Sequence, residues 1–296
     1  MADQVFGGKW TEEKLIRLRG YLEAYTQIFK DRNWATTVYV DAFAGTGEIV
    51  SKAHDASKSV VDTDEQEFAR FLIGSAQVAL LVNPPFDQYL FIEKDSMKTA
   101  DLLEMKSAFP DRADRIKVVQ AEANSYLLDW INRTKWRTTR AVVFLDPYGM
   151  QVEWKLLEAI AVTHAIDLWL LVPIGLGANR MMTQSDLPKL EWQNRLTAFF
   201  GNDDWKQRFY RIPQQTNLFG DGPSHEKAAN FDELASYFVE RLRDIFGDEG
   251  VAPNPLTLRN SRNSPMYLLC FASANKTGVK IADWLLTNKP KREGTR

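Results

Sequence analysis

The fold is decided by residues 38–47, which read Val-Tyr-Val-Asp-Ala-Phe-Ala-Gly-Thr-Gly. The apolar run 38–40 predicts a buried strand, and Asp41 places a carboxylate at the end of that strand. Gly45 and Gly47 predict a turn too tight for larger side chains. A strand, an acid and a glycine turn in this order predict a ligand-binding loop at the carboxyl edge of an α/β sheet.

The composition fits one large globular domain with an insertion, or two small domains. The chain has 296 residues, of which 45% are apolar and 26% are charged, and its net charge is −2. This balance gives no global basic field of the kind that marks many nucleic-acid binders, although a local basic patch is compatible with it. Cys270 is the single cysteine, which excludes an internal disulfide and a cysteine-based metal site. The three histidines lack ligand spacing, so no metal site is predicted.

The ends of the chain and its apolar runs bear on localisation. The first dozen residues are polar, which argues against a secretory signal. The longest apolar stretch, residues 168–176, is too short to cross a bilayer. We therefore expect a cytoplasmic protein with no membrane association.

Strands and helices alternate through the first 173 residues. Strands are predicted at 38–40, 89–93, 116–119, 140–145 and 166–172, and helices at 11–29, 65–77, 96–109, 126–133 and 154–162, with a loop at 51–64. Thr11 is the expected N-cap of the first helix. Lys14, Arg17 and Arg19 in its first turns either meet phosphates or form a solvated helix face.

The alternation predicts a Rossmann-like α/β fold with a seven-stranded, mostly parallel sheet. Strands at 256–259 and 266–272 would complete it with an antiparallel C-terminal edge, followed by a helix at 278–286. The expected divisions are an N-terminal helix packing on the core (1–35), a core (36–173 and 251–288), a helical insertion (174–250) and a basic tail (289–296).

The insertion is a candidate for substrate or partner recognition because aromatic and basic residues alternate in it. Interleaved bases and aromatics suit a nucleic-acid surface, whereas aromatics at helical spacing are usually core, so both interpretations stay open. The aromatic residues are Trp192, Phe199, Phe200, Trp205, Phe209 and Tyr210.

Two familiar nucleotide-binding motifs are missing after Gly47. No Lys-Ser or Lys-Thr follows, which excludes a Walker loop, and the third glycine of a dinucleotide fingerprint is absent. The pattern D-x-F-A-G-x-G is also how the first motif of Rossmann-like S-adenosylmethionine (SAM) methyltransferases is written. On that template Phe43, Ala44, Gly45 and Gly47 would approach the methionine part of SAM, with Asp41 near its ammonium group.

Acids after the next strands supply further candidate cofactor contacts. Glu93 closes the second predicted strand, where an acid accepts hydrogen bonds from ribose hydroxyls. Its separation from Gly47 exceeds the usual distance of about 20 residues, so a long insertion must lie between them. Glu122 follows the third strand and would accept from the adenine amine. Asn124 is a candidate cofactor contact beside it and equally a cap for the helix at 126–133, and the two roles are compatible.

The fourth strand runs directly into Asp146-Pro147-Tyr148-Gly149. An exocyclic amine is a poor nucleophile until acceptors bind its hydrogens, and the Asp146 carboxylate and the Pro147 carbonyl are two such acceptors. Tyr148 would stack on a base flipped out of its helix. The alternative is a simple turn after a strand; the upstream loop at 41–47 favours the catalytic interpretation.

These motifs together resemble the three-Cys-motif partner protein family (TcmP). The resemblance covers most of residues 9–285 and is carried by Lys14 and Tyr21, the loop 41–47, Phe91-Ile92-Glu93, residues 146–149 and the strand 166–173. It implies a class I SAM methyltransferase fold and a three-Cys-motif protein as partner. The tetrapeptide is also similar to D-P-P-Y of adenine-N6 methyltransferases, from which it lacks the second proline, and to D-P-F-G of tRNA guanine-N2 dimethyltransferases.

Two functions follow as hypotheses. The first is a SAM-dependent methyltransferase that acts on an exocyclic amine of a nucleobase in RNA or DNA, with Asp146, Pro147 and Tyr148 as catalytic residues. The alternative is a methyltransferase-like, non-catalytic protein that works in complex with a three-Cys-motif protein.

Overall fold

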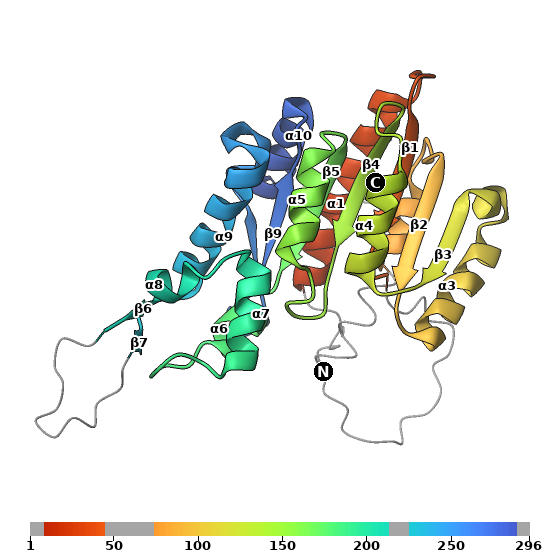
Figure 1. Cartoon of the computed structure of the whole chain (residues 1–296). Helices are drawn as coiled ribbons and strands as arrows, with labels where there is room; N and C mark the ends of the chain where they lie inside the picture. The colour runs from red at the N-terminus through yellow and green to blue at the C-terminus, as the bar shows by residue number, and fades with distance from the viewer. Residues whose placement is uncertain (1–8, 45–73, 213–224, 289–296) are drawn as a thin grey trace, which may run out of the picture.

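The structure is a computed structural model that describes residues 9–44, 74–212 and 225–288. Its centre is a seven-stranded sheet in the order β3-β2-β1-β4-β5-β9-β8 (Figure 1). The strands are β1 (Thr36–Asp41), β2 (Gln88–Glu93), β3 (Ile116–Gln120), β4 (Thr139–Leu145), β5 (Ile166–Val172), β8 (Leu256–Arg259) and β9 (Pro265–Ala272).

The predicted Rossmann-like, mostly parallel sheet is confirmed. β1 to β5 pair in parallel, β9 pairs antiparallel to β5, and β8 pairs antiparallel to β9 and forms the sheet edge. The antiparallel strand β9 therefore lies one position inside the edge, because it returns after a short loop between β5 and the preceding strand β8. No described helix is long and apolar enough to cross a membrane.

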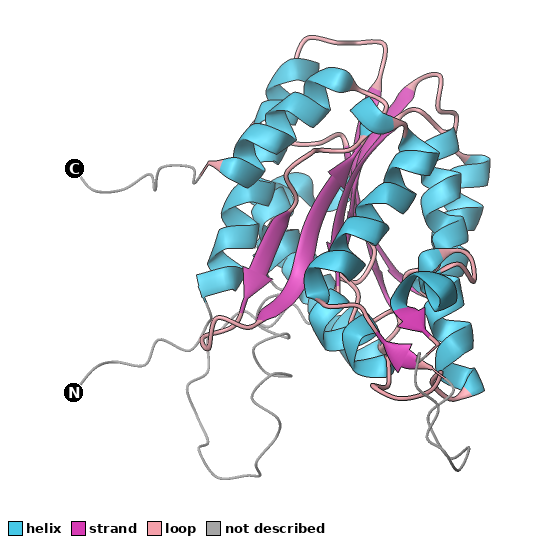
Figure 2. Cartoon of the chain, turned by 90° about the vertical axis from the view of Figure 1, so that its left-hand side faces the viewer, coloured by secondary structure: helices cyan, strands magenta, loops and turns pink. Residues whose placement is uncertain are grey.

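Helices cover both faces of the sheet (Figure 2). They are α1 (Lys9–Phe29), a helical segment at 74–81, α3 (Ser96–Ala108), α4 (Ala123–Arg133), α5 (Trp154–Val162), α7 (Leu190–Phe200), α8 (Trp205–Phe209), α9 (Phe231–Phe246) and α10 (Lys276–Thr287). Because side chains alternate along a strand, β1 sends Val38 and Val40 to one core and Tyr39 to the other. The first core packs against α4, α5, α7 and α9, and the second against α1, α3 and α10.

Two expectations about helix ends are wrong. α1 is already helical at Lys9, so Thr11 lies inside the helix and is not its N-cap. α4 begins at Ala123 with Glu122 as its N-cap, because the longer Glu122 side chain reaches the first backbone N–H groups. The predicted loop at 51–64, most of the predicted helix at 65–77, Gly45, Gly47 and the basic tail at 289–296 lie outside the described residues.

The aromatic residues of 174–250 belong mainly to the core. Phe199, Phe200, Trp205, Phe209 and Tyr210 are all buried, and Trp192 is 36% exposed. The buried aromatic residues join the cluster that packs on the α4 and α5 face of the sheet, where Phe238 of α9 meets Trp154 edge-on at 5.7 Å between ring centroids. The core interpretation of these aromatics is confirmed, while the domain boundaries stay a prediction.

Candidate functional site

Asp41 and Asp146 are brought together by the parallel pairing of β1 with β4. Asp41, the last residue of β1, pairs in register with Phe144, so Asp146 follows one position beyond the end of the neighbouring strand. Both aspartates have no solvent exposure. Two carboxylates predicted from separate motifs therefore lie at the carboxyl edge of adjacent central strands, where ligands bind in open α/β sheets.

Lys14 of α1 supplies the cation of this site. Its Nζ donates a hydrogen bond of 2.9 Å to Oδ2 of Asp146, and both side chains are fully buried. The ammonium also lies 5.3 Å from the centroid of the Phe144 ring and 6.0 Å from that of Trp10, within the range of cation–π attraction. The expectation of a solvated face is wrong for Lys14, since it shares the buried stripe of α1 with Leu18.

Ser75 is a further site residue that the sequence did not reveal. Its Oγ donates to Oδ2 of Asp41 at 2.7 Å, and the Tyr39 hydroxyl donates to the same oxygen at 3.4 Å. Ser75 belongs to the helical segment 74–81, which no sequence motif links to the strand end. The helical spacing of Lys14 from the apolar Leu18 could have indicated that Lys14 faces the core. No comparable sequence pattern indicates the position of Ser75.

One oxygen of each aspartate is left without a hydrogen bond. Within residues 9–44, 74–212 and 225–288, Oδ1 of Asp41 and Oδ1 of Asp146 are buried and have no partner. Buried polar atoms are almost always paired, so unpaired ones mark a place where a ligand or water completes the structure. In the ionised carboxylates both atoms are acceptors, and a group that completes them would then donate hydrogen bonds.

Burial perturbs the titration of all three charged groups. It raises the pKa of Asp41 to about 7, a shift that the Ser75 hydrogen bond opposes and the charge of Asp146 increases. Burial lowers the pKa of Lys14 to about 8, against the attraction of Asp146. It also raises the pKa of Asp146, with Lys14 opposing. Two buried acids share one buried cation, so the site favours a further positive charge.

The arrangement fits the amino-acid end of SAM. An ammonium group donates hydrogen bonds. Its positive charge would also compensate the net negative charge that two carboxylates and one lysine leave. Phe43 is half-buried, and Ala44 is buried with its N–H bonded to the Ile92 carbonyl at 3.1 Å. These contacts fix the start of the loop between β1 and β2; Gly45 and Gly47, its predicted cofactor-binding glycines, lie outside the described residues.

The residues after Asp146 differ in exposure. Pro147 is buried and lines a small apolar cavity with Val152, Leu157 and Phe199. Tyr148 is 55% exposed, and Gly149 has a φ of 72°, a left-handed conformation that favours glycine. The chain thus turns sharply after the buried acid and presents an aromatic ring at the surface.

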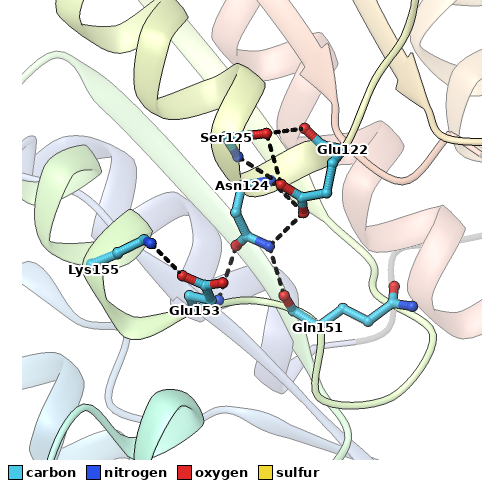
Figure 3. A network of polar contacts seen from close by, with 6 residues as sticks. All are labelled: Glu122, Asn124, Ser125, Gln151, Glu153 and Lys155. Carbon is cyan, nitrogen blue, oxygen red and sulfur yellow. Dashed lines mark hydrogen bonds and ion pairs between the residues drawn. The ribbon is translucent and has the colours of Figure 1, made fainter. Parts of the chain in front are cut away.

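Asn124 joins the loop after β3 to the loop after β4 (Figure 3). Its Nδ2 donates to the Gln151 carbonyl and to Glu122 Oε1, each at 2.8 Å, and its Oδ1 accepts from the Glu153 N–H at 3.0 Å. The prediction that Asn124 caps the helix is wrong, because Glu122 occupies that position. Asn124 instead links the two loops that carry the predicted cofactor and substrate residues.

Glu122 and Glu93 are both engaged locally. Glu122 accepts from the N–H groups of Asn124 at 3.0 Å and Ser125 at 2.8 Å. Partial burial opposes its ionisation, but these hydrogen bonds hold the pKa of Glu122 below its ordinary value. Glu93 is half-buried at the end of β2 and accepts from the Asp95 N–H at 2.7 Å. The cofactor roles of Glu93, Glu122 and Asn124 stay predictions.

Comparisons with known proteins give the chain no family. No family model matches it, and no curated protein matches it. Solved structures that resemble it include a Legionella pneumophila protein (15% identity, 81% of this chain and 94% of that chain, TM-score 0.39). The N-terminal domain of EvdMO1, solved in the presence of SAH and D-fucose, also resembles it (10%, 87% and 83%, 0.36).

A third similar structure is spermidine synthase from Thermotoga maritima (10% identity, 93% of this chain and 62% of that chain, TM-score 0.37). At these identities and TM-scores the similarities assign no activity to the chain. The resemblance to the three-Cys-motif partner family has no matching family model behind it.

Proposed function

We propose that this protein is a SAM-dependent methyltransferase that modifies an exocyclic amine of a nucleobase in nucleic acid. The observation that carries the proposal is the pair of buried aspartates at the carboxyl ends of β1 and β4, each with one oxygen that has no hydrogen-bond partner among the described residues. One acceptor suits the ammonium of the methyl donor and the other suits the amine that receives the methyl group.

In this proposal Asp41 holds the cofactor end of the site. Its Oδ2 is fixed by Ser75, which leaves Oδ1 to accept a hydrogen bond from the methionine ammonium. Glu93 would accept from the ribose hydroxyls, and Glu122 would accept from the adenine amine. SAM, when bound, would supply a methyl group attached to a sulfonium sulfur, and the neutral thioether that remains after transfer is a good leaving group.

Asp146 would hold the acceptor amine. Lys14 binds Oδ2 and stabilises the ionised carboxylate, so Oδ1 is left to accept one amine hydrogen while the Pro147 carbonyl accepts the other. Drawing both hydrogens away from the ring plane would make the nitrogen lone pair available for in-line attack on the methyl carbon. The carbon–sulfur bond would break as the nitrogen–carbon bond forms, the thioether would leave, and Asp146 would take up the amine proton that is lost. The exposed Tyr148 ring would stack on the base and hold it for that attack.

A second candidate is a non-catalytic protein that acts with a three-Cys-motif partner. The specific observation in its favour is that Lys14 already pairs with Asp146, which has no solvent exposure. A catalytic aspartate must reach its substrate, whereas a structural ion pair need not. For this candidate, the Rossmann-like sheet would serve as a scaffold for binding.

Transfer of a labelled methyl group separates these candidates. The protein is incubated with tritiated SAM and with RNA, DNA and protein fractions, and incorporation is compared with that of the Asp146→Asn variant. The methyltransferase proposal expects label in one nucleic-acid fraction with the wild type and its loss in the variant. Exposed Asp31→Asn is the matched control. Label in no fraction, together with calorimetry that detects no SAM binding, would favour the scaffold.

A further inference from the structure

A second cavity lies at the edge of the sheet opposite to Asp146. It has a volume of about 260 Å³ and lies between the last turns of α1, the starts of β4 and β5, and the end of β9. Arg140, the second residue of β4, lines it, whereas Asp146 follows the last residue of that strand. The length of the strand, roughly 20 Å, therefore separates this cavity from the candidate methyl-transfer site.

The floor of the cavity is polar but satisfied. Asp167 lines it and is 5% exposed. One of its carboxylate oxygens accepts from the Tyr21 hydroxyl at 2.6 Å, and the other accepts from the Ser273 hydroxyl. Asp167 is thus committed to bonds within the protein.

The rim carries two guanidinium groups. Arg32 is exposed and stacks over Phe29 at 5.3 Å from the ring centroid, and the half-buried Arg140 stacks over Trp34 at 4.8 Å. Arg140 also donates from Nη1 to the Trp136 and Thr139 carbonyls, which orients its fork. In the described part of the chain, neither arginine forms an ion pair with a carboxylate.

The walls of the cavity are aromatic. Tyr25 is buried, Phe29 is half-buried, and Trp34 is 49% exposed beside the opening. Arg32 and Arg140 lie on aromatic ring faces, and both oxygens of Asp167 already accept hydrogen bonds within the protein. Two such guanidinium groups suit an oxyanion, because a planar guanidinium binds carboxylate and phosphate oxygens in pairs. The aromatic walls favour a flat apolar body attached to that oxyanion.

The geometry points to a binding site for a small oxyanion carried on a planar ring. The oxyanion, a carboxylate or a phosphate monoester, lies between Arg32 and Arg140, and the ring packs against Trp34 and Tyr25. A ligand of this kind is small enough for a cavity of about 260 Å³. The site is independent of the proposed methyl transfer, since none of its lining residues belongs to the Asp41 and Asp146 cluster.

Calorimetric titration of the full chain with four probes tests this inference. Phenyl phosphate and benzoate carry the ring and the oxyanion, inorganic phosphate lacks the ring, and phenol lacks the charge. We expect saturable binding of phenyl phosphate or benzoate, and the stronger of the two identifies the oxyanion class. Inorganic phosphate and phenol should each bind at least about tenfold more weakly, because each loses one of the two sets of contacts.

Charge reversal locates the binding. Arg32→Glu should weaken the better probe by at least about tenfold, and Arg32→Met should weaken it less. Arg262→Met, in the exposed loop between β8 and β9, should leave binding unchanged. Circular dichroism checks that each variant is folded, which is expected because Arg32 lies at the surface. Saturation by neither ring-bearing anion at millimolar concentration, or equal binding by the folded Arg32→Glu variant, would overturn the inference.

Discussion

Replacing Lys14 by methionine tests how much the stability of the fold depends on the buried ion pair. The two charges are 2.9 Å apart and have no solvent exposure. At an effective dielectric constant of about 20, their attraction is about 6 kcal/mol. Burial nevertheless lowers the pKa of Lys14 to about 8, so desolvation of the ammonium outweighs the attraction that favours its charged form. Methionine keeps the length of the side chain and removes its charge.

We expect Lys14→Met to reduce the free energy of unfolding by about 3–5 kcal/mol, because it leaves Asp146 buried and uncompensated. Adding Asp146→Asn removes that charge and should recover at least half of the loss. The loss should also be smaller at pH 5 than at pH 8, since Asp146 without its lysine takes up a proton more readily.

Urea denaturation at both pH values, with wild type, both single variants and the double variant, measures these effects. Lys30→Met, at an exposed lysine just beyond α1, is the matched control and should change stability little. A double variant no more stable than Lys14→Met alone would refute the reasoning. A loss below about 1 kcal/mol would also refute it, because surface ion pairs reach only that value.

Three further predictions concern the other site residues. Burial raises the pKa of Asp41 to about 7, so the folded state keeps a proton that the unfolded state loses from about pH 4. The free energy of unfolding of the wild type, relative to that of Asp41→Asn, should therefore fall by up to about 4 kcal/mol between pH 4 and pH 8 in denaturation curves. Asp146→Asn should abolish methyl transfer in the labelled assay, and retained turnover would exclude a catalytic role for Asp146. SAM binding measured by calorimetry should stay within about threefold of wild type, which is less than the factor of ten that corresponds to 1.4 kcal/mol. Asn124→Leu breaks three hydrogen bonds and should lower the free energy of unfolding by about 3 kcal/mol in urea, whereas Asn132→Leu, exposed on the same helix, should not.

Much of the fold could be predicted because its signals are local. Helix α5 begins and ends where the apolar spacing of 154–162 predicts, and β5 matches its predicted run at 166–172. Buried parallel strands form continuous apolar runs, and the acids that end them mark the carboxyl edge without knowledge of the tertiary structure. Asp41 and Asp146 were found in this way.

The rest of the site depends on contacts that local patterns do not contain. Lys14 meets Asp146 across 132 positions, and Ser75 meets Asp41 from a segment without a motif. The N-cap of α4 is not predictable from local sequence, because Glu122 and Asn124, two positions apart, can both reach free N–H groups. The choice depends on the β4–α5 loop that binds Asn124. Local sequence patterns indicate the succession of strands and helices. They do not indicate which distant side chain pairs with a buried charged group.

The ion pair between Lys14 and Asp146 also has a consequence for synthesis on the ribosome. Lys14 emerges early, and its partner follows 132 residues later. At ordinary elongation rates the first helix waits on the order of 10 s before the strand that completes its charge is made. During that interval only β1, β2 and β3 of the sheet are made, and the buried stripe of α1, including Leu18 and Tyr21, lacks β4, β5 and β9. Helix α1 is therefore made before every described strand of the sheet and is one of the last elements that can reach its final place.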